Sequence, residues 1–223
     1  RAALAAELAD LPRDYHNRDT LLCHIERRAA ERPDALAVSL FCYDTAPVGD
    51  LLDALERMQQ PSVVHVPPGK PLAAVMRHLP GNGPWQLGNS RIEPLPFMPL
   101  DDYDQLLWQC DINFVRGEDS FVRAQWAGKP FIWQIYQQEE DAHLIKLSAF
   151  LKRYCAEMTE EDGRAITNMF ASWNGAESSV ADAWAAFLAH SQGIGISSRA
   201  WSRKLAMESD LATRLVNFCA ARV

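Results

Sequence analysis

The chain has 223 residues, of which 48% are hydrophobic and 23% charged, an ordinary composition for a globular protein that buries a sizeable core. Its formal net charge of −7 argues against a nucleic-acid-binding protein, because such proteins usually present a basic face. No apolar run approaches the length of about 18 residues that suggests a membrane span, and no signal peptide is recognisable. We therefore expect neither a membrane nor a nucleic acid as partner.

The cysteines and histidines give no sign of a metal centre. The five cysteines are widely spaced in apolar runs, without a CxxC pair, and the six histidines show no HExxH-like spacing. We interpret the cysteines as buried thiols of a protein in a reducing cytoplasm. They are Cys23, Cys42, Cys110, Cys155 and Cys219.

The first part of the chain is predicted to be a helical linker followed by the start of one domain. Residues 2–11 are alanine-rich, with leucines on one face, and the polar residues 14–19 follow them. A second helix begins near Leu21 and ends near Pro33. We assign residues 1–18 to the linker helix and residues 19–223 to the domain.

Strand-length apolar runs alternate with helical patterns from residue 36 to residue 154. Such alternation predicts an α/β fold, a Rossmann-like parallel sheet with helices on both faces. The predicted strands are residues 36–43, 63–66, 92–97, 111–115 and 131–136. The predicted helices are residues 48–58, 71–79, 120–127 and 142–154, with a further helix capped by Asp101. We expect Trp108, Trp126 and Trp133, which fall inside these elements, to lie in the core.

From about residue 159 the pattern becomes wholly helical, so we expect a helical C-terminal extension. Its apolar residues fall into three stripes at helical spacing. The stripes are Ile166, Met169, Phe170 and Trp173; Trp184, Phe187 and Leu188; and Leu211, Leu215, Phe218 and Cys219.

The most informative stretch is residues 111–134, DINFVRGEDSFVRAQWAGKPFIWQ. It predicts a strand, a polar loop, a helix with Asp119 or Ser120 as N-cap and Gly128 as its left-handed end, and another strand. In an open parallel sheet this loop lies at the carboxyl end of a strand, where ligands bind. The N-terminus of the following helix suits a phosphate.

The loop itself consists of Arg116, Gly117, Glu118, Asp119 and Ser120. The guanidinium can bind phosphate oxygens bidentately, and the serine hydroxyl adds a donor. The two carboxylates can accept hydrogen bonds from sugar hydroxyls. We therefore expect a ligand with both phosphate and sugar groups; the alternative is an ion-paired, capped turn without a ligand.

Three aromatic residues end other predicted strands at the same rim. Phe41 and Tyr43 end the first strand, and Phe97, between prolines, ends the third. Each can stack on a base, and the tyrosine can also bind a phosphate; core packing is the alternative. VPPGK at residues 66–70 lacks the spacing of a phosphate-binding P-loop, so we interpret it as a turn.

Residues 113–136, NFVRGEDSFVRAQWAGKPFIWQIY, with LPFMP and YDQLLWQCD before them and EEDAHLIKL after them, resemble the EarP family. EarP-like proteins are bacterial protein-arginine rhamnosyltransferases that modify translation elongation factor P. The resemblance runs from about residue 95 to residue 147, with SLFCYD upstream. It implies that Phe41, Tyr43, Phe97 and residues 116–120 bind the nucleotide sugar. Leu100 stands where close relatives are expected to carry a glutamine that contacts the base.

The resemblance also implies one half of a two-lobed GT-B glycosyltransferase. The C-terminal half would bind dTDP-β-L-rhamnose, with Arg116 and Ser120 stabilising the leaving dTDP in an inverting reaction without metal or cofactor. The N-terminal half would hold the catalytic aspartate and most of the surface for elongation factor P, and this sequence shows no such aspartate loop. We expect this cytoplasmic chain to bind the donor without catalysis. A GT-B-like nucleotide-sugar epimerase and a non-catalytic interaction domain are the alternatives.

Overall fold

A computed structural model of the chain describes residues 34–138, 142–176 and 178–221. The predicted linker helix, the helix predicted to end near Pro33 and Cys23 lie outside the described residues. Everything below concerns the described part of the chain.

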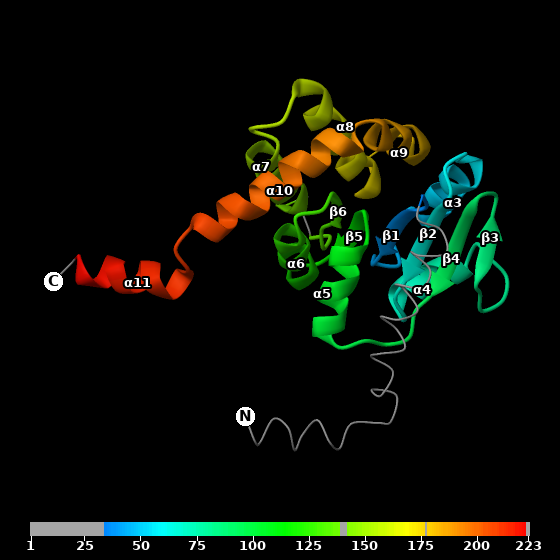
Figure 1. Cartoon of the computed structure of the whole chain (residues 1–223), viewed down its shortest axis with the longest axis horizontal. Helices are drawn as coiled ribbons and strands as arrows, with labels where there is room; N and C mark the ends of the chain where they lie inside the picture. Colours follow the sequence, from blue (N-terminus) through cyan, green and yellow to red (C-terminus); the bar gives the residue numbers. More distant parts are fainter. Residues whose placement is uncertain (1–33, 139–141, 177, 222–223) are drawn as a thin grey trace, which may run out of the picture.

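The centre of the molecule is a six-stranded sheet with the order β3-β4-β2-β1-β5-β6 (Figure 1). All five predicted strands are present and pair in parallel. β1 and β4 each end three residues earlier than predicted, at Leu40 and Pro94, so Phe41, Tyr43 and Phe97 lie in the loops beyond them. β3 was not predicted; it has three residues and pairs antiparallel with the edge of β4. The strands are β1 Leu36–Leu40, β2 Ser62–Val66, β3 Trp85–Leu87, β4 Ser90–Pro94, β5 Ile112–Arg116 and β6 Phe131–Gln134.

The chain leaves β1 and β5 in opposite directions. After β1 it proceeds to β2 and β4 on one side, and after β5 it proceeds to β6 on the other. The two strands are themselves neighbours, with Ser39 paired to Asn113 and Leu40 to Phe114. This reversal of strand order opens a crevice outside the carboxyl ends of β1 and β5, the usual ligand position in such sheets.

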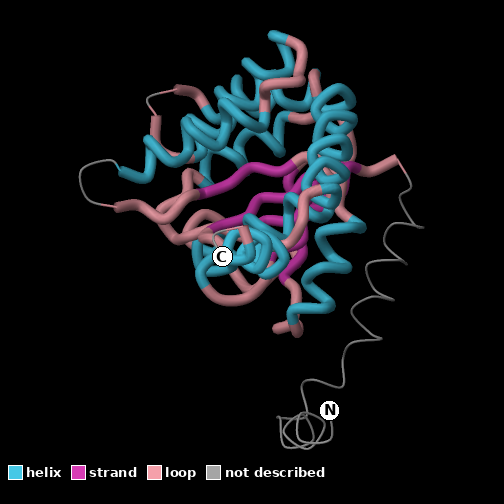
Figure 2. The backbone as a smooth tube through the Cα atoms, turned by 90° about the vertical axis from the view of Figure 1, so that its left-hand side faces the viewer, coloured by secondary structure: helices cyan, strands magenta, loops and turns pink. Residues whose placement is uncertain are grey.

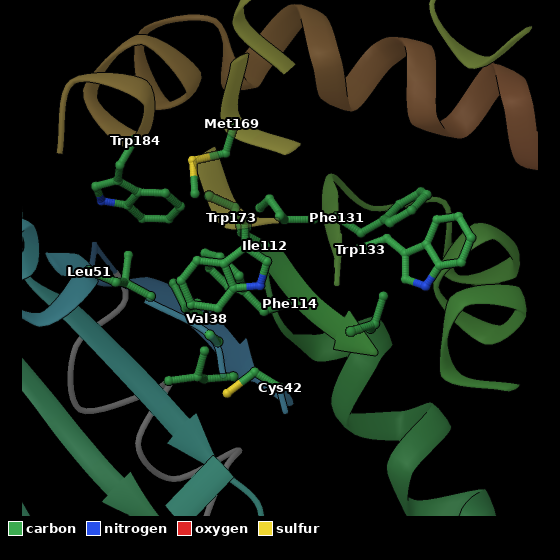
Figure 3. Close-up of a cluster of buried hydrophobic side chains, with 14 of the residues drawn as sticks. Val38, Cys42, Leu51, Ile112, Phe114, Phe131, Trp133, Met169, Trp173 and Trp184 are labelled. Atoms are coloured by element: carbon green, nitrogen blue, oxygen red, sulfur yellow. The ribbon is translucent and has the colours of Figure 1, made fainter. Parts of the chain in front are cut away.

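Helices cover both faces of the sheet, as predicted (Figure 2). α8 and α9 place large side chains on β5, where the Phe114 ring lies 4.6 Å from Trp173 and 5.7 Å from Trp184 between ring centroids (Figure 3). The helices are α3 Val48–Arg57, α4 Lys70–Met76, α5 Leu100–Gln109, α6 Asp119–Ala127, α7 Ala142–Tyr154, α8 Glu160–Trp173, α9 Val180–Ala189, α10 Ser191–Met207 and α11 Leu211–Ala220.

Several details differ from the sequence prediction. Trp133 is buried, as expected, but Trp108 and Trp126 are about half exposed on α5 and α6, so their assignment to the core was wrong. Asp101 does not cap α5: the N-cap is Pro99, and Asp101 lies in the first turn. Among the described cysteines, Cys42 and Cys110 are buried thiols, Cys155 is partly exposed and Cys219 is exposed.

The helical C-terminal extension is confirmed. α10 packs across α6, where Trp201 Nε1 donates to Gln125 Oε1 at 2.9 Å and Ser202 Oγ donates to the Trp126 carbonyl at 3.1 Å. α11 contains no buried residue and projects away from the sheet (Figure 1). None of the helices in the described ranges has the length and apolar character needed to cross a membrane.

The contrast between Trp173 and Trp126 gives a test of the core. Replacing Trp173, which is 1% exposed, by alanine leaves a cavity against Phe114 and should lower the free energy of unfolding by about 3–5 kcal/mol. The matched change of Trp126, which is 51% exposed, should cost less than about 1 kcal/mol. Urea unfolding curves of both variants measure the difference, and equal losses would contradict this description of the core.

Candidate functional site

The crevice at the strand ends contains an open cavity of about 950 Å³. Each of the eight residues predicted to bind the ligand lines it: Phe41, Tyr43, Phe97, Arg116, Gly117, Glu118, Asp119 and Ser120. They come from three separate segments: the loop after β1, the loop after β4, and the stretch from the end of β5 to the first turn of α6. The fold therefore brings together residues that lie up to 79 positions apart in the sequence.

Two aromatic rings hold the Arg116 side chain at this cavity. Its guanidinium carbon lies 4.5 Å from the Phe41 ring centroid and 4.8 Å from the Tyr43 ring centroid. Cation–π contacts of this kind orient a guanidinium without using its N–H groups in an ion pair. No ion pair of this guanidinium with a carboxylate occurs among the described residues, so its donors remain available to a ligand.

Gly117 is needed at its position for two reasons. Its φ of +63° lies in the left-handed region, which side chains rarely adopt. A Cβ atom there would also lie only 2.9 Å from the Tyr43 hydroxyl. The glycine therefore allows the loop after β5 to approach the loop after β1, and its carbonyl accepts a hydrogen bond of 2.7 Å from Trp133 Nε1.

A buried glutamine, which the sequence reasoning did not single out, fixes the two loops relative to each other. Gln134, at the end of β6, accepts from the Tyr43 backbone N–H at 2.7 Å and donates to Thr45 Oγ1 at 3.3 Å. Its backbone carbonyl accepts from the Gly117 N–H at 3.2 Å. The glutamine occurs in the quoted stretch, but only the pairing of β6 beside β5 shows that it reaches the β1 loop.

The start of α6 differs from the prediction. Asp119 does not cap the helix; its carboxylate accepts from Arg123 Nε at 2.9 Å, one turn along the helix. Ser120 lies inside the helix, where its hydroxyl accepts from the Arg116 N–H at 3.1 Å and donates to the Arg116 carbonyl. Because no side chain caps α6, its first N–H groups remain available to an anion at the cavity.

Burial raises the pKa of several groups around the cavity. Desolvation raises the pKa of Tyr43, and the charge of Glu118 adds to the effect while Arg116 opposes it. Burial likewise raises the pKa of Tyr103, whose ring lies 5.5 Å from Phe41. A phenol is protonated at neutral pH even at its ordinary pKa of about 10, and burial moves both phenols further from ionisation. Burial raises the pKa of Cys42 to about 12, so this thiol is neutral and a poor nucleophile.

The cavity also contains residues that the sequence reasoning did not assign to it. The turn predicted for VPPGK is confirmed, but it borders the cavity through Pro67, Pro68 and Lys70. The remaining lining residues are Met98, Pro99, Leu100, Asp101 and Tyr103. Within the described part of the chain, no group of three or more His, Cys, Asp or Glu side chains could hold a metal ion.

The altered roles of Ser120 and Asp119 lead to a stability prediction. Ser120→Ala removes two hydrogen bonds to the Arg116 backbone from a side chain that is almost fully buried, and should cost about 1–3 kcal/mol of unfolding free energy. Asp119→Ala removes only an exposed i,i+4 pair and should cost about 0.3–0.5 kcal/mol. Chemical denaturation separates these values, and a larger loss for Asp119→Ala would restore this residue as the helix cap.

Comparison with known proteins places these features in a family context. Residues 2–220 match the family described as "Elongation-Factor P (EF-P) rhamnosyltransferase EarP". A protein-arginine rhamnosyltransferase of Pseudomonas putida is 42% identical over 192 residues, which are 83% of this chain and 50% of that protein. Another from Pseudomonas aeruginosa is 41% identical over 201 residues, 88% of this chain and 52% of that protein.

A solved structure is also similar. It is described as "Structural basis for EarP-mediated arginine glycosylation of translation elongation factor EF-P" and superposes with a TM-score of 0.75 at 36% sequence identity. The superposition covers 93% of this chain and 70% of the other chain. The present chain spans about half the length of the curated relatives that it matches.

Proposed function

The chain belongs to the EarP family, and from this premise we propose that it is the donor-binding half of a GT-B-type protein-arginine rhamnosyltransferase. The observation that supports the proposal most directly is the cavity at the β1–β5 crevice. It combines a guanidinium held between two rings, an uncapped helix start and exposed carboxylates. We propose dTDP-β-L-rhamnose as the donor and an arginine of elongation factor P as the acceptor.

The parts of such a donor match different parts of the cavity. Phe97, Met98 and Pro99 offer an apolar surface for the base. Arg116 and the first N–H groups of α6 suit the diphosphate. Glu118, which is exposed and accepts hydrogen bonds, suits a hydroxyl of the nucleotide sugar. Leu100 lines the cavity with an apolar side chain and cannot hydrogen-bond to the base.

The proposed reaction transfers rhamnose from dTDP to a guanidinium nitrogen. The nitrogen attacks the anomeric carbon while the bond from that carbon to the diphosphate oxygen breaks, which inverts the configuration. A guanidinium has a pKa above about 12 and is a poor nucleophile, so a carboxylate has to accept its proton. Negative charge grows on the departing diphosphate, where Arg116 and the start of α6 would stabilise it.

In this proposal the base comes from outside the residues described above. The side chains at the cavity supply donor binding and leaving-group stabilisation, and the acceptor is held mainly by the other half of the enzyme. Because the proposed acceptor is a translation factor, we also propose that the protein acts in the cytoplasm. No cofactor beyond the donor itself enters the proposed reaction.

Binding without transfer is the first expected result. The 223 residues by themselves should bind dTDP-β-L-rhamnose and dTDP more tightly than UDP-glucose in calorimetric titrations, because the apolar surface and the loop after β5 belong to this chain. Mass spectrometry of elongation factor P incubated with the chain and donor should show no added rhamnose. Absence of dTDP binding would contradict the proposal. Rhamnosylation by the chain alone would contradict the proposal that the catalytic base comes from outside these residues.

Replacement of Arg116 tests the diphosphate contact. Arg116→Ala removes a charge-assisted hydrogen-bonding group worth about 1.5–3 kcal/mol, so the affinity for dTDP should fall roughly ten- to a hundredfold. The melting temperature should change little, because the side chain is partly exposed and makes no ion pair with any described residue. Arg57→Ala, at the exposed end of α3, is the matched control and should leave affinity unchanged. A large loss of stability with unchanged affinity would make Arg116 structural.

A further inference from the structure

The cavity contains a second cation that the donor site described above does not use. Among the described residues that line the cavity, only Arg116 and Lys70 carry cationic side chains. Lys70 begins α4, directly after the VPPG turn that follows β2. It therefore reaches the cavity from a different strand than Arg116.

Both cations lie against the same aromatic ring. Lys70 Nζ is 5.6 Å from the Tyr43 ring centroid, and the Arg116 guanidinium carbon is 4.8 Å from it. Both positive charges therefore lie within 5.6 Å of the Tyr43 ring centroid, at the border of the cavity. Two cations there suit a ligand group with more than one negative charge, such as a diphosphate.

In the structure described here Lys70 is held by Asp44. Its Nζ lies 3.2 Å from Asp44 Oδ1, and both side chains are about half exposed. The hydrogen bond from Lys70 lowers the pKa of Asp44 below its ordinary value, so this carboxylate is ionised at neutral pH. Exposed ion pairs contribute little to stability, so Lys70 can exchange Asp44 for a phosphate at small cost.

The charges around the cavity favour such an exchange. Its lining includes the carboxylates of Asp101, Glu118 and Asp119. Of these, Asp119 is paired with Arg123, which also contacts Asp104 at 2.8 Å. Without Lys70, the Arg116 charge and the partial positive charge at the start of α6 would have to offset Asp101, Glu118 and both charges of a diphosphate, so a second full positive charge at the cavity favours binding.

We propose that Lys70 is a second diphosphate-binding residue, which leaves Asp44 and contacts the phosphates when a nucleoside diphosphate sugar enters the cavity. The inference rests on the proposed function and adds a contact to it. Lys70 and Arg116 then approach the diphosphate from the β2 side and the β5 side of the crevice. Both stabilise the charge that develops on the leaving group.

A series of ligands with increasing numbers of phosphates tests this role. Lys70→Met should weaken dTDP binding about ten- to a hundredfold, weaken dTMP binding less, and leave thymidine binding unchanged, because the effect follows phosphate charge. Lys70→Arg should retain most of the dTDP affinity. Lys146→Met, on α7 and outside the cavity, is the control and should behave like the wild type.

Asp44→Asn tests the release of Lys70 by changing its partner in the ion pair. It removes the carboxylate that competes for Lys70 without altering a residue that lines the cavity. The dTDP affinity should rise by about two- to fivefold, the equivalent of one exposed ion pair. In the Lys70→Met background the same change should have no effect on affinity, since no lysine is left to release.

The outcomes separate the inference from the function on which it rests. If the wild-type chain does not bind dTDP, the proposed function fails and this inference fails with it. If the wild type binds and Lys70→Met leaves dTDP affinity unchanged, or weakens thymidine and dTDP equally, Lys70 does not bind the diphosphate. Melting curves of the variants show whether each is folded before its affinity is compared.

Discussion

The parallel pairing of β1 with β5 is the constraint on which the site depends. These two strands begin at residues 36 and 112, so their adjacency closes a long stretch of chain. A buried polar contact accompanies it: Ser39 Oγ donates to Asn113 Oδ1 at 2.9 Å, and Asn113 Nδ2 donates to the Leu107 carbonyl at 2.9 Å. Because buried polar groups are costly when unpaired, these bonds favour one register over its neighbours.

That register determines which residues face the crevice. With Leu40 opposite Phe114, the chain beyond β1 presents Phe41 and Tyr43 to the residue that ends β5, Arg116. Gln134 then joins the loops through three hydrogen bonds, two from its side chain and one from its backbone. A shift of one residue would turn these side chains to the opposite face of the sheet. The site is thus a consequence of sheet register, not of one contiguous motif.

The sequence predicted the elements well where their signals are strong and local. Five parallel strands, the end of α6 at the left-handed Gly128 and the extent of α7 were confirmed. β3 was missed because three residues at a sheet edge carry no periodic pattern. Trp108 and Trp126 follow a helical pattern but face outward, since the period of a helix does not reveal which face its neighbours cover.

Prediction of the site is limited in the same way, because a sequence pattern does not show which residues of separate elements meet. The eight predicted residues do line one cavity, because loops at strand ends could be inferred from the strand pattern. That neither Asp119 nor Ser120 caps α6 could not be inferred, since either residue type can serve as an N-cap and only the backbone path near Arg116 decides. Lys70 was not assigned to the site because no spacing rule links the turn after β2 to the loop after β5. Their proximity follows from the order of the strands.

The arrangement of charges at the cavity is compatible with the proposed binding of an anion by an acidic chain. The carboxylate in the first turn of α6, Asp119, is paired with Arg123, and Arg123 is in turn shared with Asp104. Arg116, by contrast, is held by aromatic rings, which fix its position and leave its donors without a carboxylate partner among the described residues. Ion pairs at the edge of the site thus remove repulsion, while ring contacts inside it keep one cation available. Binding an anion therefore requires little rearrangement of Arg116, and the cost of orienting this side chain is met during folding.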